Sequence, residues 1–524
     1  MSFLSTQYLG FLGILFLVYY TLGAHNKKLQ WIILLIASYV FYGFYSIKYT
    51  AFLIFSTLVT WGAAMGISKA YTCEKAEIKA DASITKEQKK AIRAAYDKKR
   101  TQWVVLAVVL NIGLLFLMKY ANFGIKSFNS LLGLNIGQLK WVVLPLGFSF
   151  YTFQSLGYCI DVYRGAVDAE RNPLKYALFV SFFPQICEGP IGNYQELAPQ
   201  FFEGHRFEYD SFVKGLIRIL TGTFKKLVVA DTIAMFVDPV YASHGDFSGA
   251  ILLLATCLYS VQLYADFSGY IDSALGSGAC LGIQLTENFS TPYFSRSITE
   301  FWRRWHISLG TWFRNYLYYP VLRSSAVSSL GKKLSKQGKK KLASSVTATI
   351  GLVATWTLIG MWHGAAYKFL IYGWYHGFFV ILAVWMSDTY KKAKDTLHIK
   401  ENGAWKLFQI IRTFAIVTLG YVIFRADGFS TALSIYQRIL GSFYYEGALT
   451  GLYLLSTGDW IIIVFGVVSV FLFDLVERKA PIADWIYSRS IVLRWPMLYA
   501  LLAITLLFFL NKPADAGNFI YFNF

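Results

Sequence analysis

The sequence predicts an all-α polytopic membrane protein, and three observations support this fold class. Hydrophobic residues make up 56% of the 524 residues and charged residues only 15%, whereas a soluble domain carries about 25% charged residues. Several apolar runs reach about 20 residues, enough for a helix to cross a hydrocarbon core of ~30 Å. Short polar or basic stretches separate these runs. A soluble enzyme, a disordered chain and a secreted disulfide scaffold are therefore excluded.

The apolar runs predict about 10–13 transmembrane or re-entrant helices. They lie at residues 8–24, 29–47, 49–67, 102–118, 141–160, 174–187, 212–237, 248–267, 343–362, 365–387, 407–424, 459–476 and 491–511. Two segments are expected to be re-entrant or interfacial. Pro184 and Pro190 interrupt residues 174–192, and four lysines and arginines load residues 212–230.

Positive charge, a net +19, collects in three polar stretches, at residues 68–100, 323–341 and 388–406. Loops rich in lysine and arginine stay in the cytoplasm, and this rule places all three stretches on that side. The first has helical spacing without proline or glycine, which predicts a cytoplasmic amphipathic helix. Since membrane topology explains the basic excess, we expect no nucleic-acid partner. The five cysteines show no spacing typical of a disulfide framework or a metal site.

The densest group of functional candidates lies at residues 297–316. Ser297 with Glu300 three residues on predicts a capping box at the start of a helix. Helical spacing then places one set of side chains on a single face: Trp302, Trp305, His306, Leu309, Trp312 and Phe313. Arg303, Arg304 and Arg314 project elsewhere. Two interpretations of these arginines stay open, an anchor among lipid headgroups and a site for an anionic ligand.

A second candidate histidine, His363, lies at the junction of two apolar runs. Gly360 and Gly364 flank it, and small residues allow another backbone or a substrate to approach closely. A neutral imidazole there accepts a proton from a hydroxyl or thiol nucleophile. The alternative is a histidine that only bonds one helix to another. With Trp362 beside it and His306 as a second titratable group, we favour a catalytic role.

Two further polar residues fall at membrane depth. Asp266 follows Gln262 by one helical turn, and a carboxylate there needs a partner, for which we expect an arginine of the 303–314 helix. A structural or site-orienting role is favoured for Asp266. His376, thirteen residues beyond His363, is expected to serve packing or structural bonding.

These motifs are similar to those of the membrane-bound O-acyltransferase family, and specifically of its bacterial alginate O-acetyltransferase membrane subunits. The resemblance runs from about Leu4 to about Gly441. Its motifs are Leu144–Phe153, Ile160–Gly165, Gly189–Ile191, Asp266–Tyr270, Glu287–Phe289, Pro292–Tyr293, Arg296–Tyr319, Met361–Gly364 and Phe424–Ala426. The chain departs from the family pattern at Cys187–Glu188 and at Tyr318–Leu322, which makes the polysaccharide less certain than the family.

The resemblance implies a single membrane domain over residues 1–524, with a tunnel, a catalytic core at 144–390 and C-terminal helices at 407–524. It implies His363 as the catalytic histidine and His306 as the second key polar residue. Asp266, Trp302, Arg303, Arg304, Trp305 and Trp362 are then expected to bind the donor or support the site.

The resemblance further implies acetyl-CoA as a cytoplasmic donor substrate, with no tightly bound cofactor. The acetyl group would pass to an extracytoplasmic polysaccharide or to a partner O-acetyltransferase, and the protein would lie in the bacterial cytoplasmic membrane, among its lipids. Three alternatives remain: D-alanyl transfer to teichoic acid from a carrier protein, a proton-coupled transporter or flippase of cell-envelope glycan, and a scaffold of an envelope complex.

Overall fold

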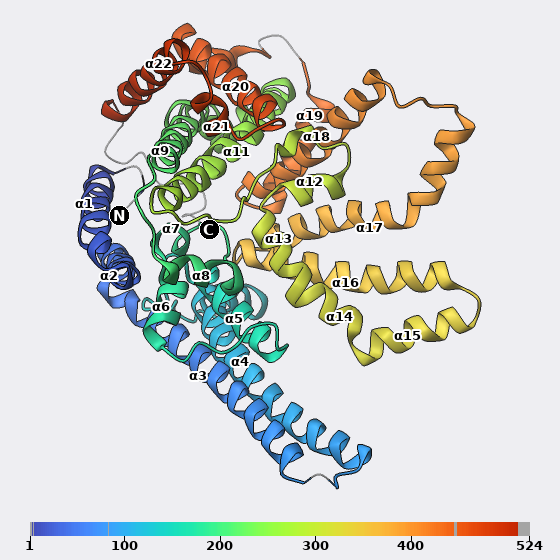
Figure 1. Ribbon diagram of the computed structural model, residues 1–524. Helices are drawn as coiled ribbons and strands as arrows, with labels where there is room; N and C mark the ends of the chain where they lie inside the picture. Colours follow the sequence, from blue (N-terminus) through green and yellow to red (C-terminus); the bar gives the residue numbers. More distant parts are fainter. Residues whose placement is uncertain (1–2, 4, 82, 445–447, 512–524) are drawn as a thin grey trace. The chain divides into compact units, whose positions relative to one another are not determined.

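The computed structural model describes residues 3, 5–81, 83–444 and 448–511, and within these residues the chain is helical apart from loops and one isolated β-bridge (Figure 1). The chain divides into two compact units. The first comprises residues 1–215 and 274–286, and the second comprises residues 216–273 and 287–524. Residues 512–524, part of the predicted C-terminal region, lie outside the described residues.

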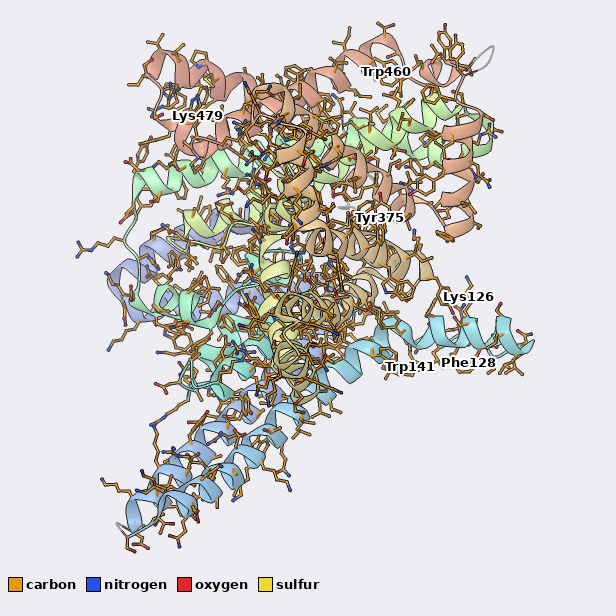
Figure 2. All side chains as sticks on the ribbon, turned by 90° about the vertical axis from the view of Figure 1, so that its right-hand side faces the viewer. Lys126, Phe128, Trp141, Tyr375, Trp460 and Lys479 are labelled. Atoms are coloured by element: carbon orange, nitrogen blue, oxygen red, sulfur yellow. The ribbon has the colours of Figure 1, made fainter. Side chains whose placement is uncertain are left out.

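The first unit is built on four long helices and several short ones. They are α1 (Thr6–His25), α2 (Lys27–Tyr45), α3 (Ile47–Ala80), α4 (Lys86–Leu132), α5 (Phe148–Tyr163), α6 (Pro173–Ser181), α7 (Phe183–Ile186) and α8 (Tyr194–Glu203). The loop after α4 folds back on the last turns of that helix, because Asn122 and Asn129 donate to the carbonyl oxygens of Leu139 and Ile136. Figure 2 shows Lys126 and Phe128 on this part of α4, and Trp141 in the returning loop.

The prediction of one amphipathic helix over residues 68–100 is wrong. The stretch forms the ends of α3 and α4, which pack as an antiparallel hairpin and turn between Asp81 and Thr85 (Figure 1). The turn ends in a capping box. Gln88 N–H donates to the Thr85 hydroxyl at 3.2 Å, and Thr85 N–H donates to the Gln88 side chain at 2.9 Å. This cap starts a new helix inside a stretch that has no proline or glycine.

Two helices, α9 (Tyr209–Phe224) and α11 (Gly249–Cys280), belong to both units, and all the remaining helices belong to the second. These are η1 (Lys225–Ala230), α10 (Asp231–Ala242), η2 (His244–Asp246), η3 (Pro292–Phe294), α12 (Ile298–Arg304), α13 (Ile307–Phe313), η4 (Arg314–Tyr318), α14 (Tyr319–Arg323), α15 (Ser325–Lys336), α16 (Lys340–His363), α17 (Tyr367–Thr396), α18 (Gly403–Arg425), α19 (Phe429–Gly441), η5 (Thr450–Leu454), α20 (Thr457–Glu477), α21 (Ile482–Tyr487) and α22 (Ile491–Leu510). The segments η1 and η4 are π-helical turns, which occur mainly at functional sites.

Within the described residues, 10 helices are long and apolar enough to cross a membrane: α1, α2, α3, α4, α11, α16, α17, α18, α20 and α22. Each coincides with one of the predicted apolar runs. The remaining runs form shorter helices: 141–160 gives α5, 174–187 gives α6 and α7, and 212–237 gives α9, η1 and α10. The protein is therefore an all-α, multi-pass membrane protein, as predicted.

The helices α16 and α17 cross at two glycines. A Cβ atom at Gly373 would lie 2.4 Å from the carbonyl oxygen of Trp356, and one at Gly360 would lie 2.6 Å from that of Phe369. Gly364, by contrast, makes room for the ring of Phe369, which a Cβ would meet at 2.4 Å. The glycines beside His363 therefore allow α17 to pack closely on the helix that carries this histidine.

Substitution Gly373→Ala should destabilise the protein, because the added methyl group has to push two backbones apart. Overpacking of this kind typically costs about 1–3 kcal/mol, and we expect a lower midpoint of thermal unfolding in detergent. Gly13→Ala in α1 is the matched control, because a Cβ there meets no heavy atom within 4 Å. Equal midpoints for the two variants would contradict this account of the crossing.

Candidate active site

One cavity of about 210 Å³ in the second unit contains both predicted histidines. The side chains of α12, α13 and η4 form one wall and those of α16 form the other, with Val380 of α17 completing it. The predicted residues in this lining are Trp302, Arg303, Trp305, His306 and His363. Two imidazoles that are far apart in the sequence therefore border one mostly apolar cavity.

The indole of Trp362 lies between the two histidines. Its ring centroid is 5.7 Å from that of His306 and 4.9 Å from that of His363, both in edge-on contacts. All three side chains are buried, with exposed fractions of 4% for His306, 6% for His363 and 9% for Trp362. Water is thus largely excluded from both imidazoles.

The predicted continuous helix over 297–316 is wrong, because the chain breaks at Trp305–His306. Ser297 does begin a helix, and its hydroxyl accepts the Glu300 N–H at 3.2 Å. The Glu300 carboxylate, however, caps the N–H of Arg296 at 2.9 Å. After α12 ends at Arg304, Trp305 forms an isolated bridge with Phe289, and His306 takes a left-handed conformation with φ 47°.

Asn288 holds this break in place. Its carbonyl oxygen accepts the N–H of Ile307 at 3.0 Å, and its side-chain Oδ1 accepts the N–H of Ser308 at 2.9 Å. These bonds satisfy backbone donors that the interrupted helix leaves open. A left-handed conformation costs a non-glycine residue about 1–2 kcal/mol. Such strain typically persists at functional sites, where the surroundings hold it.

The same Asn288 oxygen sets the tautomer of His306. His306 Nδ1 lies 3.4 Å from Asn288 Oδ1, which is fixed as an acceptor by the backbone N–H of Ser308. A neutral His306 therefore carries its proton on Nδ1 and presents a lone pair at Nε2. Burial lowers the pKa of His306 to about 3, so the neutral form prevails at physiological pH.

His363 closes α16 and is surrounded by aromatic rings. Its ring centroid lies 5.2 Å from that of Phe424 and 5.6 Å from that of Tyr372, both in edge-on geometry. These contacts come from α17 and α18, so three helices fix the orientation of the imidazole. The aromatic cage leaves one side of the ring against Trp362 and the cavity.

The two arginines of the predicted site differ in their surroundings. Arg304 pairs with Glu300 at 2.7 Å and approaches the Thr291 hydroxyl at 3.3 Å, so its charge is already compensated. Arg303 is exposed and borders the cavity, and no ion pair recorded among the described residues involves it. Of these two arginines, Arg303 is the one available to an anionic ligand.

The two predicted tryptophans of α12 and its end have supporting positions. Trp305 is buried and stacks on Phe301 at 5.5 Å, with an angle of 19° between the planes. Trp302 packs edge-on against Trp356 at 5.0 Å and against His376 at 4.8 Å. His376 is fully buried and lies outside the cavity lining. These contacts agree with the packing role predicted for His376.

The prediction that Asp266 pairs with an arginine of the 303–314 stretch is wrong. Lys226 donates to its carboxylate, and the same ammonium lies 2.8 Å from Asp231. Lys226 and Asp266 are almost fully buried. The neighbour of Asp266, Phe267, contacts the His306 ring edge-on at 4.9 Å. The ion pair of Asp266 therefore fixes α11 at the point where the next residue, Phe267, packs on His306, consistent with the orienting role predicted for Asp266.

A second ion network lies beside this one. Lys225 donates to Asp272 at 2.8 Å and lies 3.8 Å from Glu477 of α20. Arg218 bonds the other oxygen of Asp272 at 3.0 Å and both carboxylate oxygens of Glu287. Glu287 directly precedes Asn288. The network thus joins α9, η1, α11 and α20 to the loop that fixes His306.

Sequence reasoning missed Asn288 as a positioning residue and missed the two lysines as partners of the buried carboxylates. The signal for the lysines was present, since Lys225 and Lys226 lie within an apolar run, where charges are costly. Asn288 belonged to a motif used only for the family resemblance. Its contact with residues 306–308 is invisible to local helical spacing.

Substitution Lys226→Met should destabilise the protein strongly, because it removes the ammonium between two carboxylates. Removing one partner of a buried pair typically costs about 3–5 kcal/mol. The double variant Lys226→Met/Asp266→Asn has one fewer buried charge than Lys226→Met and should regain part of the lost stability. Thermal unfolding of the purified variants measures both effects. A double variant no more stable than Lys226→Met would show that the pairing contributes little.

Comparisons with known proteins agree with this site. The family model described as membrane-bound O-acyltransferase matches residues 167–422, which include both histidines. The probable alginate O-acetylase AlgI of Pseudomonas putida is 34% identical over 453 residues, 86% of this chain and 79% of that protein. The peptidoglycan O-acetyltransferase of Helicobacter pylori is 31% identical, over 82% of this chain and 78% of that protein. The teichoic acid D-alanyltransferase of Bacillus subtilis is 32% identical, over 54% of this chain and 69% of that protein.

Relatives at least 31% identical thus match this chain along most of its length, and the matched region contains the two buried histidines. The chain therefore belongs to the membrane-bound O-acyltransferase family and is an acyltransferase.

Proposed function

We propose that the protein transfers acetyl groups from cytoplasmic acetyl-CoA to an extracytoplasmic acceptor. The acceptor is a polysaccharide hydroxyl or a partner O-acetyltransferase that passes the group on. The observation that carries the proposal is the meeting of His306 and His363 at one buried cavity. Two buried imidazoles that line one mostly apolar cavity suit acyl transfer, since burial limits a competing hydrolysis of the donor by water.

The extent of similarity favours acetyl over D-alanyl transfer. Relatives named for O-acetylation match over 81–88% of this chain, whereas the named D-alanyltransferase of Bacillus subtilis matches over 54%. Both groups of relatives are acyltransferases, so D-alanyl transfer from a carrier protein is the second candidate.

His363 is the general base of the proposed reaction. As the acceptor hydroxyl oxygen bonds to the thioester carbonyl carbon, an imidazole nitrogen of His363 takes the hydroxyl proton. The carbon–sulfur bond then breaks, and the imidazolium returns this proton to the departing thiolate of CoA. The products are the acetyl ester and CoA, and His363 is neutral again.

His306 acts as a hydrogen-bond acceptor. Two roles are open to His306, positioning the donor or stabilising the oxyanion as a hydrogen-bond donor. With the proton on Nδ1 facing Asn288, Nε2 offers a lone pair, which favours positioning the donor over donating a hydrogen bond to an oxyanion. Asn288 is then a positioning residue for the reaction.

Arg303 is the proposed contact for a phosphate of CoA. Its guanidinium is exposed at the cavity, and bidentate guanidinium–phosphate bonds are strong. Arg304, already paired with Glu300, is not assigned this role. The bacterial cytoplasmic membrane is the proposed location, because only there does one face meet the acetyl-CoA pool and the other the cell envelope.

The choice of donor is tested by supplying the purified, reconstituted protein with either [¹⁴C]acetyl-CoA or a carrier protein charged with [¹⁴C]D-alanine. We expect label on added polysaccharide or on a co-purified partner from acetyl-CoA alone. Transfer from the D-alanyl carrier alone would replace the proposal with the second candidate. Labelled glycan transport without any acetyl ester would indicate a transporter instead.

Substitution His363→Ala should lower acetyl transfer by about 10²–10⁴, the usual contribution of a general base. The matched control is His244→Ala, which removes a histidine outside the cavity and should leave the rate unchanged. Yield and monodispersity of both variants in detergent verify folding. Full activity of a well-folded His363→Ala variant would reject the assignment.

A further inference from the structure

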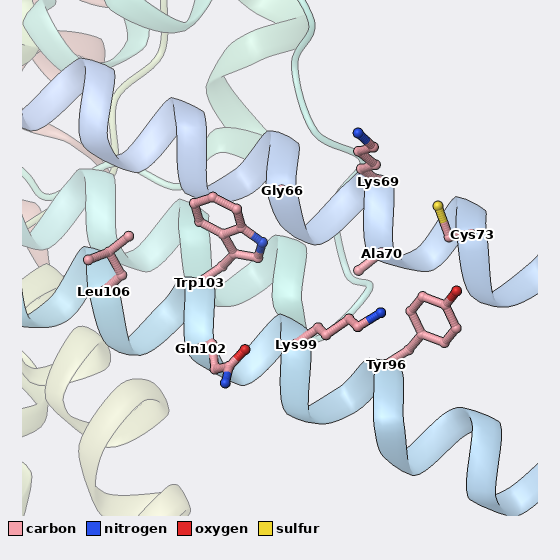
Figure 3. Close-up of a pocket in the computed structure, with 9 residues that line it drawn as sticks. All are labelled: Gly66, Lys69, Ala70, Cys73, Tyr96, Lys99, Gln102, Trp103 and Leu106. Atoms are coloured by element: carbon pink, nitrogen blue, oxygen red, sulfur yellow. The ribbon is translucent and has the colours of Figure 1, made fainter.

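We propose that the α3–α4 hairpin of the first unit binds an anionic phospholipid, with its headgroup phosphate between Lys69 and Lys99. A groove of about 430 Å³ runs between the two helices at this point. Figure 3 shows Lys99 lying along the groove and Lys69 at its rim on α3, with the Trp103 ring reaching across to α3. The groove lies outside the acyltransferase site and does not depend on the proposed donor.

The groove is built by a glycine and a tryptophan that face each other. Trp103 lies so close to Gly66 that a Cβ atom there would meet the indole at 2.3 Å. The ring is 39% exposed and forms one end of the groove. A half-exposed tryptophan where an apolar helix becomes charged is typical of the bilayer interface. The groove therefore lies at the depth of the headgroups.

Neighbouring carboxylates do not neutralise the two lysines, because they are engaged elsewhere, and the Lys99 ammonium lies 4.6 Å from the centroid of the Tyr96 ring in the groove. Glu74 pairs with Arg100 and lies 3.9 Å from Arg93, and Glu77 accepts the Tyr96 hydroxyl at 2.8 Å. Asp97 also lies 3.5 Å from Arg100. Of the ion pairs recorded in the described part of the hairpin, none involves Lys69 or Lys99. Two exposed cations beside an open groove are complementary to a phosphodiester.

An apolar groove of about 640 Å³ continues along the same face of the hairpin. Phe52 and Phe55 of α3 line it, together with Leu110, Gly113 and Leu117 of α4. On both helices the lining positions of the two grooves follow steps of three and four residues, which keeps them on one helical face. The positions that follow these steps are 52, 55, 66, 69 and 73 on α3, and 96, 99, 103, 106, 110, 113 and 117 on α4; positions 51, 70, 102, 109 and 114 also line the grooves.

The separation of the two grooves matches one leaflet of a bilayer. From Gly66 to Phe55 the helix rises about 16 Å, at 1.5 Å per residue. One leaflet contributes about 15 Å of hydrocarbon, half of the ~30 Å core. A phospholipid with its phosphate at Lys69 and Lys99 thus has its acyl chain along the apolar groove. A free phosphate would leave that second groove unused.

The test is photo-crosslinking of the full-length protein in phosphatidylcholine nanodiscs. A small fraction of either phosphatidylglycerol or phosphatidylcholine carries a diazirine in its headgroup, and mass spectrometry maps the labelled peptides. We expect phosphatidylglycerol to label residues 66–73 and 96–106, and phosphatidylcholine to label them weakly. Excess inorganic phosphate should not displace the label.

Charge reversal distinguishes a specific lipid site in the groove from general electrostatic attraction of anionic lipid to the hairpin. Lys69→Glu/Lys99→Glu should lower labelling by about 30-fold or more, since each basic residue near the surface contributes about 1 kcal/mol. The control Lys75→Glu/Lys98→Glu has the same net charge on the same hairpin but spares the groove, and should stay within about threefold of the parent. If the reversed pair does not fold, Lys69→Gln/Lys99→Gln replaces it.

Three results would overturn the proposal. An equal loss of labelling in the two double variants would show that labelling depends only on the general positive charge of the hairpin. Equal labelling by the two lipids, or displacement by inorganic phosphate alone, would exclude a site for an anionic lipid. None of these results bears on acetyl transfer, which the His363 variant tests separately.

Discussion

The hydrogen bonds that Asn288 accepts from the backbone N–H groups of residues 307 and 308 are the constraint on which the candidate site depends. In a membrane protein the donors exposed by a broken helix must find partners within the protein. Asn288 supplies them, and so the chain can take a left-handed turn at His306. This turn places the imidazole against Trp362, across from His363. A continuous helix would leave the histidine as one more member of an aromatic stripe.

Buried charges supply the rigidity that this loop needs. Glu287, next to Asn288, is tied through Arg218 to Asp272, and Asp272 is tied through Lys225 to α20. Lys225 and Asp272 are buried; each charge is costly to bury alone, and each is compensated by a neighbour. The single-residue difference between Lys225 and Lys226 directs the two ammonium groups to different carboxylates, Asp272 and Asp266. The π-helical turn η1 is the element that presents both lysines to α11.

The sequence predicted correctly those features that neighbouring residues determine. Bilayer thickness sets the length of apolar runs, and for that reason hydropathy alone locates all ten candidate spans. The histidines could be singled out because titratable groups are rare at membrane depth. Local patterns failed where a distant residue decides the outcome. Asn288, 18 residues before His306, interrupts a helix with good periodicity, and Lys226, 40 residues before Asp266, replaces the expected arginine. The capping box at Thr85 starts a new helix in a stretch whose composition favours one continuous helix.

The link from Lys225 to Glu477 has a consequence for biosynthesis. A ribosome completes the segment around Lys225 long before it makes α20, which carries Glu477. Until α20 emerges, this carboxylate is missing from the surroundings of the ammonium, which then has Asp272 of α11 as its partner. The α9–α10 region therefore gains this last ionic contact only when α20 is made. The second unit matures only after translation has nearly ended, so truncations upstream of α20 should yield a chain that inserts without settling into its final form.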